Sequence, residues 1–115
     1  MFKTVEIDCS KILTFADFHT VFSTAMGFPD FYGRNMDAWI DCMTYVDSPE
    51  EGMTSVHVEK GGFMVLVLKN VDDMIASCPK AYEALVDDVA FVNHRRMEIG
   101  EPPVLGLSYH ANPNR

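Results

Sequence analysis

Hydrophobic and polar residues follow one another along the chain in a pattern that predicts strands separated by helices. Residues 2–8 alternate between apolar and polar side chains, which favours a first strand. Thr14 with Asp17 three residues later is typical of a helix start, and Gly27 is typical of a helix end. The expected core positions between them recur at helical spacing and are Phe15, Phe18, Phe22 and Ala25 or Met26.

A second helix is predicted after the turn-forming stretch GFPDFYGR, residues 27–34. Asn35 precedes the periodic residues, and its side chain can accept hydrogen bonds from the first free N–H groups. One stripe at steps of three and four is expected to be buried and contains Met36, Trp39, Met43 and Val46. The other stripe is expected on the outer face and contains Asp37, Ile40, Asp41 and Thr44.

The middle of the chain predicts an acidic loop followed by a hairpin. Residues 47–52 are acidic and carry turn-forming residues, and residues 54–59 alternate as a half-exposed strand would. The glycines at 61–62 provide a turn. Residues 63–68 are continuously apolar, which is typical of a central strand covered on both faces. We therefore expect 54–59 to be an extra edge strand paired with 63–68.

The last third of the chain predicts two helices and a final strand. Asn70 is expected to cap a short helix, and Pro79 is expected to begin a longer one. Gly100 and the two following prolines end it before a strand at 104–109, and residues 110–115 are expected to be frayed. The buried positions predicted for the long helix are Tyr82, Leu85, Val86, Val89, Val92 and Met97.

This alternating order of strands and helices predicts an α/β fold with a small, mainly parallel sheet flanked by helices. At 115 residues the chain is long enough to bury one core, so we expect a single domain over 1–115. An α/β architecture of this kind serves many functions and does not identify one.

The charge balance narrows the partners that this chain can bind. Nine basic residues stand against seventeen acidic ones, a formal net charge of -8, which disfavours nucleic acid and anionic membranes and favours basic partners. No apolar run approaches the roughly 20 residues of a membrane span, and the N-terminus lacks the pattern of a signal peptide. Three widely spaced cysteines favour reduced thiols, so we expect a cytoplasmic protein.

The outer stripe of the second helix is unusual for a plain surface. Asp37 and Asp41 are like charges four residues apart, an arrangement that costs a few tenths of a kcal/mol in an isolated helix. Ile40 would place apolar surface between them. Two interpretations fit these residues: the stripe is a binding surface, or Ile40 flanks the core and the aspartates are a solvated face.

Enzymatic and metal-binding interpretations are weaker. The four histidines have no metal-like spacing, and the sequence contains no nucleophile elbow, phosphate loop or calcium loop. We therefore expect no cofactor, no metal and no catalytic residues. A second acid pair, Asp72 and Asp73, is expected to complement the dipole at the start of the short helix.

The stretch FPDFYGRNMDAWIDCMT resembles the barstar-like family, whose prototype is an intracellular inhibitor of the ribonuclease barnase. The family signature is an aromatic pair, Gly, any residue, Asn, an aliphatic, Asp, Ala, two variable positions, Cys, an aliphatic and Thr. It is matched without a gap by Phe31, Tyr32, Gly33, Asn35, Met36, Asp37, Ala38, Asp41, Cys42, Met43 and Thr44. Outside this stretch the agreement is one of element order.

The resemblance implies that the second helix and the preceding loop block a ribonuclease active site. Asp41 matches the acid that the family inserts where substrate phosphate would sit, and Asp37 matches a second acid at the rim. The partner-binding residues that it implies are Phe31, Tyr32, Asp37, Ile40, Asp41 and Thr44.

Four departures from the prototype predict a target other than barnase. Ile40 stands where the prototype has a tryptophan, and a large aromatic expected shortly after Thr44 is missing, where Tyr45 and Val46 stand. The segment 47–62 is longer. An acid expected on the penultimate helix has no clear counterpart, with Asn93, His94 and Glu98 in the region.

The function predicted from the sequence is an immunity or antitoxin-type inhibitor of a basic, secreted microbial ribonuclease or related nuclease toxin. The alternative is an acidic interaction or regulatory module on the same fold with a partner that is not a ribonuclease.

Overall fold

Three parallel strands form the sheet in the computed structural model, which describes residues 2–115. Leu66 on the central strand lies in register between Val5 and Leu107 on its two neighbours. The small parallel sheet predicted from the sequence is therefore confirmed. The strands, in the spatial order of the sheet, are β1 (Phe2–Asp8), β2 (Phe63–Lys69) and β3 (Leu105–His110).

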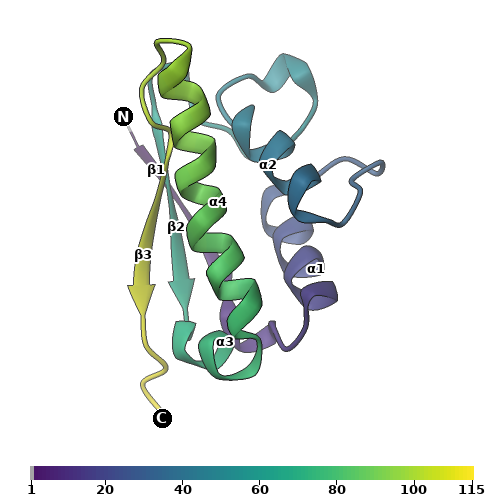
Figure 1. Cartoon of the computed structure of the whole chain (residues 1–115), viewed down its shortest axis with the longest axis vertical. Coiled ribbons are helices and arrows are strands. Elements are labelled where there is room, and N and C mark those ends of the chain that lie inside the picture. Colours follow the sequence, from purple (N-terminus) through teal and green to yellow (C-terminus); the bar gives the residue numbers. More distant parts are fainter. Residues whose placement is uncertain (1) are drawn as a thin grey trace.

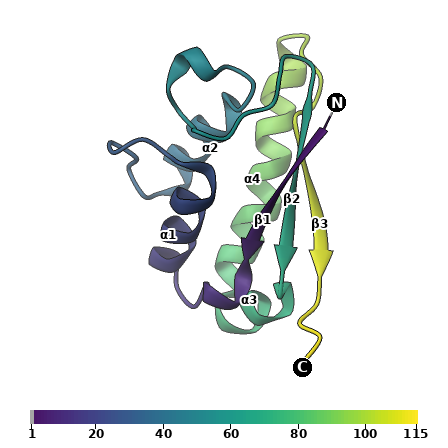
Figure 2. The ribbon, with the colours of Figure 1, turned by 180° about the vertical axis from the view of Figure 1, so that it is seen from behind.

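Four helices complete the α/β fold and lie on one side of the sheet (Figures 1 and 2). The long α4 crosses in front of the strands in Figure 1 and behind them in Figure 2, and α1 and α2 lie beside it. The helices are α1 (Phe15–Met26), α2 (Met36–Thr44), α3 (Val71–Ser77) and α4 (Pro79–Glu98), with short 3-10 turns η1 (Cys9–Lys11) and η2 (Pro49–Glu51).

The single layer of helices corrects one prediction for the central strand. Met64, Leu66 and Leu68 face the helices and are fully buried, whereas Phe63 and the other odd-numbered apolar residues of β2 are only half-buried. The expectation that 63–68 is covered on both faces is therefore wrong. The Phe63 ring partly covers the open face by lying over Gly106, where an added Cβ would meet ring carbons at 2.8 Å.

The predicted edge strand at 54–59 is also wrong, because this segment is irregular and does not pair with β2. Both edges of β2 are taken by its parallel neighbours. The backbone of the segment instead reaches the ends of two helices: the Ser55 N–H donates to the Met26 carbonyl at 2.9 Å, and the Val58 N–H donates to the Val46 carbonyl at 2.9 Å. The segment therefore closes the end of the core beside α2, near the top in Figure 1.

The helix starts at Thr14, Asn35 and Pro79 are confirmed, and Asn70 occupies the N-cap position of α3 as predicted but makes no side-chain cap hydrogen bond. The Asn70 backbone is left-handed, with φ 56°, and its side chain donates to Asp8 across the molecule at 3.1 Å. Met97, predicted to be buried on α4, is 58% exposed, because the core side of this helix continues from Val92 to Arg96.

The C-terminal tail lies against the start of α3. The Asn112 N–H donates to Asp72 at 2.8 Å, and Arg115 donates to Asp73 at 2.7 Å. The Arg115 bond first, and a bond from the Asn112 side-chain amide to Asp73 at 3.0 Å second, hold the pKa of Asp73 below its ordinary value. The segment that the sequence predicts to be frayed thus has specific partners in the structure.

Candidate functional site

The helix α2 is held by its cap and by a buried aromatic side. The Asn35 side chain accepts a hydrogen bond from the Ala38 N–H at 2.8 Å, as predicted, and Asp37 in the first turn complements the helix dipole. Trp39 and Met43 are fully buried against the rest of the core. This side fixes the rotation of the helix and so decides which residues face outward.

Asp37 and Asp41 face outward, as expected from the sequence. Both are exposed, and no Lys or Arg within residues 2–115 comes within 4.0 Å of Asp37. Asp41 has one cationic neighbour, Arg95 on α4, whose Nη1 lies 3.8 Å from Asp41 Oδ1. Two carboxylates on one helix face are therefore open to a partner.

Ile40 does not share this outer face, and that placement is a correction. It is only 9% exposed and belongs to the core. The helix α2 packs against α4, and its Trp39 also meets Phe22 of α1, so the buried arc of α2 is wider than one stripe. Thr44 is half-buried, and its hydroxyl donates to the Ile40 carbonyl at 2.6 Å. Apolar surface between the two aspartates is thus absent.

The loop before α2 presents an aromatic side chain beside the acids. Phe31 is 74% exposed, the most exposed phenylalanine in the described chain. Tyr32, its neighbour, is half-buried and packs against Phe28 in a tilted arrangement, with ring centroids 4.5 Å apart. The two aromatics of the sequence signature therefore differ in role: one is free for contact, and the other anchors the loop.

Two polar anchors fix this loop to α1. The Tyr32 hydroxyl lies 2.6 Å from His19 Nδ1, and Arg34 donates to the Ala16 carbonyl at 2.9 Å and to Thr20 Oγ1 at 3.0 Å. Burial raises the pKa of Tyr32 and lowers the pKa of His19, so the bonded pair is neutral. Arg34 adopts φ 54°, a conformation that these bonds to α1 hold in place.

The loop and α2 enclose a hollow of about 270 Å³. The structure here brings together three of the predicted contact residues, Phe31, Tyr32 and Asp41. Met53, from the longer 47–62 segment, forms part of the wall. No periodic pattern in the sequence predicts this position. Burial raises the pKa of the Cys42 thiol in this wall to about 11, which keeps it uncharged at neutral pH.

The long helix α4 adds charged and aromatic residues next to α2. Burial first, then the charges of Asp87 on the same helix and of Asp37 on α2, raise the pKa of Asp88. Phe91 is 47% exposed, and the Arg95 guanidinium lies 5.8 Å from its ring centroid. We use "acidic face" for Asp37, Asp41 and Asp88. Asp88 was missed from the sequence because its proximity depends on how the two helices pack.

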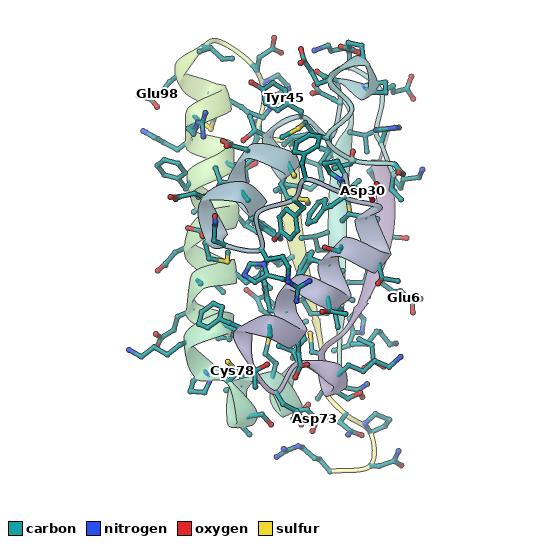
Figure 3. The ribbon with its side chains drawn as sticks, turned by 90° about the vertical axis from the view of Figure 1, so that its right-hand side faces the viewer. Glu6, Asp30, Tyr45, Asp73, Cys78 and Glu98 are labelled. Carbon is teal, nitrogen blue, oxygen red and sulfur yellow. The ribbon has the colours of Figure 1, made fainter. Side chains whose placement is uncertain are left out.

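The residues considered for a further acid on α4 have other roles. The Asn93 side chain binds the backbone at the start of β3, accepting from the Val104 N–H at 2.9 Å and donating to the Leu105 carbonyl at 2.8 Å. Glu98 pairs with His94 at 3.7 Å, at the far end of α4 (labelled in Figure 3).

A buried ion pair fixes the end of α2 to α4. Asp47 is 2% exposed and Arg96 is 6% exposed, and they form two hydrogen bonds at 2.6 and 3.0 Å. Arg96 also donates to the Thr44 carbonyl at 2.8 Å. Asp47, expected in an acidic loop, is thus a structural residue that holds the base of the 47–62 segment.

The described residues, 2–115, contain no group of three or more His, Cys, Asp or Glu side chains that could hold a metal ion. Within the same residues, no helix is long and apolar enough to cross a membrane.

Comparison with known proteins agrees with the loop and helix described above. The family profile described as Barstar (barnase inhibitor) matches residues 2–104. A Bacillus subtilis (strain 168) protein named "Putative ribonuclease inhibitor YrdF" is 31% identical over 86 residues, which cover 64% of this chain and 79% of the relative. With this match over nearly its whole length, the chain belongs to the Barstar family.

Proposed function

We propose that this protein inhibits a basic microbial ribonuclease by covering its active site with α2 and the loop 27–35. The observation that carries the proposal is the pair of exposed carboxylates, Asp37 and Asp41, on a rigidly held helix. The description of the family as barnase inhibitors, and the name of the Bacillus relative, support the same class of partner.

The chemistry of the acidic face suits such a partner. A ribonuclease binds the phosphates of RNA through cationic side chains, so carboxylates can occupy the positions that phosphates would take. The formal net charge of -8 favours fast encounter with a basic protein, and close charge pairs then slow dissociation. Asp41, at the centre of this surface, is the residue we propose to enter the active site.

The apolar part of the proposed interface comes from the loop. Phe31 is exposed at its tip, and the hollow between Phe31 and Asp41 can receive a side chain of the partner. Tyr32 and Thr44 border this surface and complete the proposed contact set, while Ile40 supports it from beneath.

We further propose that the target differs from barnase and that the inhibitor acts in the cytoplasm on a nuclease made for secretion. The buried Ile40 and the wall residue Met53 give this face a shape of its own. A target with a matching shape, encoded beside this protein, would fit an immunity or antitoxin role.

A panel of purified basic microbial ribonucleases, with barnase included, tests the proposal. RNA cleavage is measured with wild type, Asp41→Asn and the control Glu6→Gln, which removes the same charge on β1, at the edge opposite α4 in Figure 3. We expect wild type and Glu6→Gln to inhibit at least one enzyme, and Asp41→Asn to be weaker by about 100-fold or more.

Equal inhibition by wild type and Asp41→Asn would contradict the proposed site. Failure to inhibit any ribonuclease of the panel would contradict the function and favour the regulatory-module alternative.

A further inference from the structure

Asp41 is not free in the unbound protein, because Arg95 on α4 lies beside it. Arg95 Nη1 is 3.8 Å from Asp41 Oδ1, and the two side chains are 41% and 60% exposed. This separation exceeds the 2.7–3.2 Å of a hydrogen bond, so the pair is a loose, solvent-exposed one. The carboxylate proposed to capture a cation of the partner therefore already has an internal cation next to it.

We propose that Arg95 is a built-in competitor for the partner's cation at Asp41 and that it sets the specificity of the acidic face. This inference rests on the proposed function. A partner that offers a single exposed Lys or Arg gains little, because it only replaces Arg95. A partner with several closely spaced cations engages Asp37 and Asp41 together and displaces Arg95 with a net gain.

The adjacent Arg96 shows that the loose geometry is particular to Arg95. Arg96 is 6% exposed and binds Asp47 through two hydrogen bonds, at 2.6 and 3.0 Å. If Arg96 moved away, the buried Asp47 carboxylate would lose this partner, which is costly. Arg95 makes no hydrogen bond to Asp41 in the structure and faces solvent. One arginine of this pair is structural, and the other can move.

Phe91 offers Arg95 a second interaction besides the one with Asp41. The guanidinium carbon lies 5.8 Å from the centroid of the Phe91 ring, one helical turn away on α4. A cation over an aromatic ring is attracted to it. Arg95 can therefore move off Asp41 while staying over Phe91, and displacement does not require the side chain to become fully solvated.

Charge variants on α4 test the competition. Arg95→Gln and the control Lys80→Gln each remove one positive charge, so the formal net charge changes from -8 to -9 in both. Lys80 lies 15 residues earlier on the same helix, about 22 Å away at 1.5 Å per residue. Any difference in partner binding between the two variants therefore reflects where the charge was removed and not the change in net charge.

The probe is the ribonuclease that wild type inhibits most strongly in the panel, with lysozyme as a basic protein that has no ribonuclease site. We expect Arg95→Gln to bind the ribonuclease about two- to fivefold more tightly than Lys80→Gln does. We also expect a larger relative gain for lysozyme, which is a loss of selectivity. Arg95→Lys, which keeps the charge, should bind like wild type.

The same comparison in an Asp41→Asn background shows whether Arg95 acts through Asp41. The advantage of Arg95→Gln over Lys80→Gln should disappear there. Equal or weaker binding by Arg95→Gln than by Lys80→Gln, or an advantage that persists without the Asp41 charge, would overturn the inference and leave the proposed function intact. Unchanged ribonuclease binding by Asp41→Asn alone would instead contradict the proposed function.

A partner-free measurement completes the test. In the unbound protein, the NMR resonance of the Arg95 side-chain Nε–H should shift on Asp41→Asn and stay unchanged on Glu6→Gln. An unchanged resonance on Asp41→Asn would show that the two groups do not interact and would overturn the inference.

Discussion

For single residues, adjacent positions on α2 differ sharply in exposure. Asp41 is exposed and contributes little to the core, whereas Ile40, one position earlier, is 9% exposed and packs in it. The loop residue Phe31 resembles Asp41 in this respect, because it is large and apolar yet 74% exposed. Stability and the proposed partner binding therefore fall on different side chains, so substitutions can separate them.

Ile40→Ala should destabilise the fold by about 2–4 kcal/mol, because it leaves a cavity in the core. Phe31→Ala, a truncation of an exposed side chain, should change the free energy of unfolding by less than about 0.5 kcal/mol. Urea denaturation followed by tryptophan fluorescence measures both. A loss for Ile40→Ala as small as that for Phe31→Ala would show that Ile40 does not pack in the core.

At the scale of elements, the loop 27–35 owes its shape to α1. The Tyr32 hydroxyl meets His19 Nδ1 at 2.6 Å, and His19 is 4% exposed. Burial first, and the Arg34 charge second, hold the pKa of His19 below its ordinary value of 6.5. The imidazole is therefore neutral in the folded protein, and protonating it places a positive charge in a buried position near Arg34.

Acidification should weaken the fold at this anchor. A histidine with a lowered pKa in the folded state stabilises fully above its unfolded pKa, and this stabilisation is lost as the pH falls from 6.5 through the folded pKa. Thermal unfolding of wild type and His19→Gln at pH values from about 8 to about 5 measures it. The stability difference in favour of wild type should shrink on acidification. A difference that is constant with pH would contradict the neutral state of His19.

Some elements of the fold follow from local sequence, and others depend on residues far away in the chain. Asn35 and Asn70 both occupy the N-cap position of a helix, but only the Asn35 side chain accepts a cap hydrogen bond. The Asn70 side chain instead donates to Asp8, 62 residues away in sequence. The alternation at 54–59 predicts a strand, but β2 has no free edge to pair with. The helices, the parallel strands and the signature loop follow local rules, whereas these exceptions depend on tertiary neighbours.

Across the whole chain, the net charge and the positions of the acidic residues on α2 and α4 both favour a basic partner. A net charge of -8 favours basic partners over the whole surface, whereas Asp37 and Asp41 are exposed on α2 and Asp88 lies on the neighbouring α4. The spacing of residues in the sequence does not show which side of α4 faces α2. Asp88, Phe91 and Arg95 therefore became part of the candidate site only in the folded chain.

Association with the ribonuclease should slow as salt is added. Between about 0.01 and 0.15 M ionic strength the Debye length falls from about 30 to about 8 Å, which screens attraction before contact. We expect the association rate constant from stopped-flow fluorescence to fall about tenfold or more, with a smaller change in the dissociation rate constant. An association rate constant that is independent of salt would contradict electrostatic steering.

Blockage of the ribonuclease active site by α2 is tested most directly by the inhibition constants of wild type, Asp41→Asn and Glu6→Gln for the most strongly inhibited ribonuclease, measured at increasing RNA concentrations. If α2 covers the active site, RNA should compete with wild type and with Glu6→Gln, and Asp41→Asn should leave the enzyme active at concentrations at which the other two silence it. Inhibition that RNA cannot relieve, or that Asp41→Asn retains in full, would contradict the claim that Asp41 enters the ribonuclease active site.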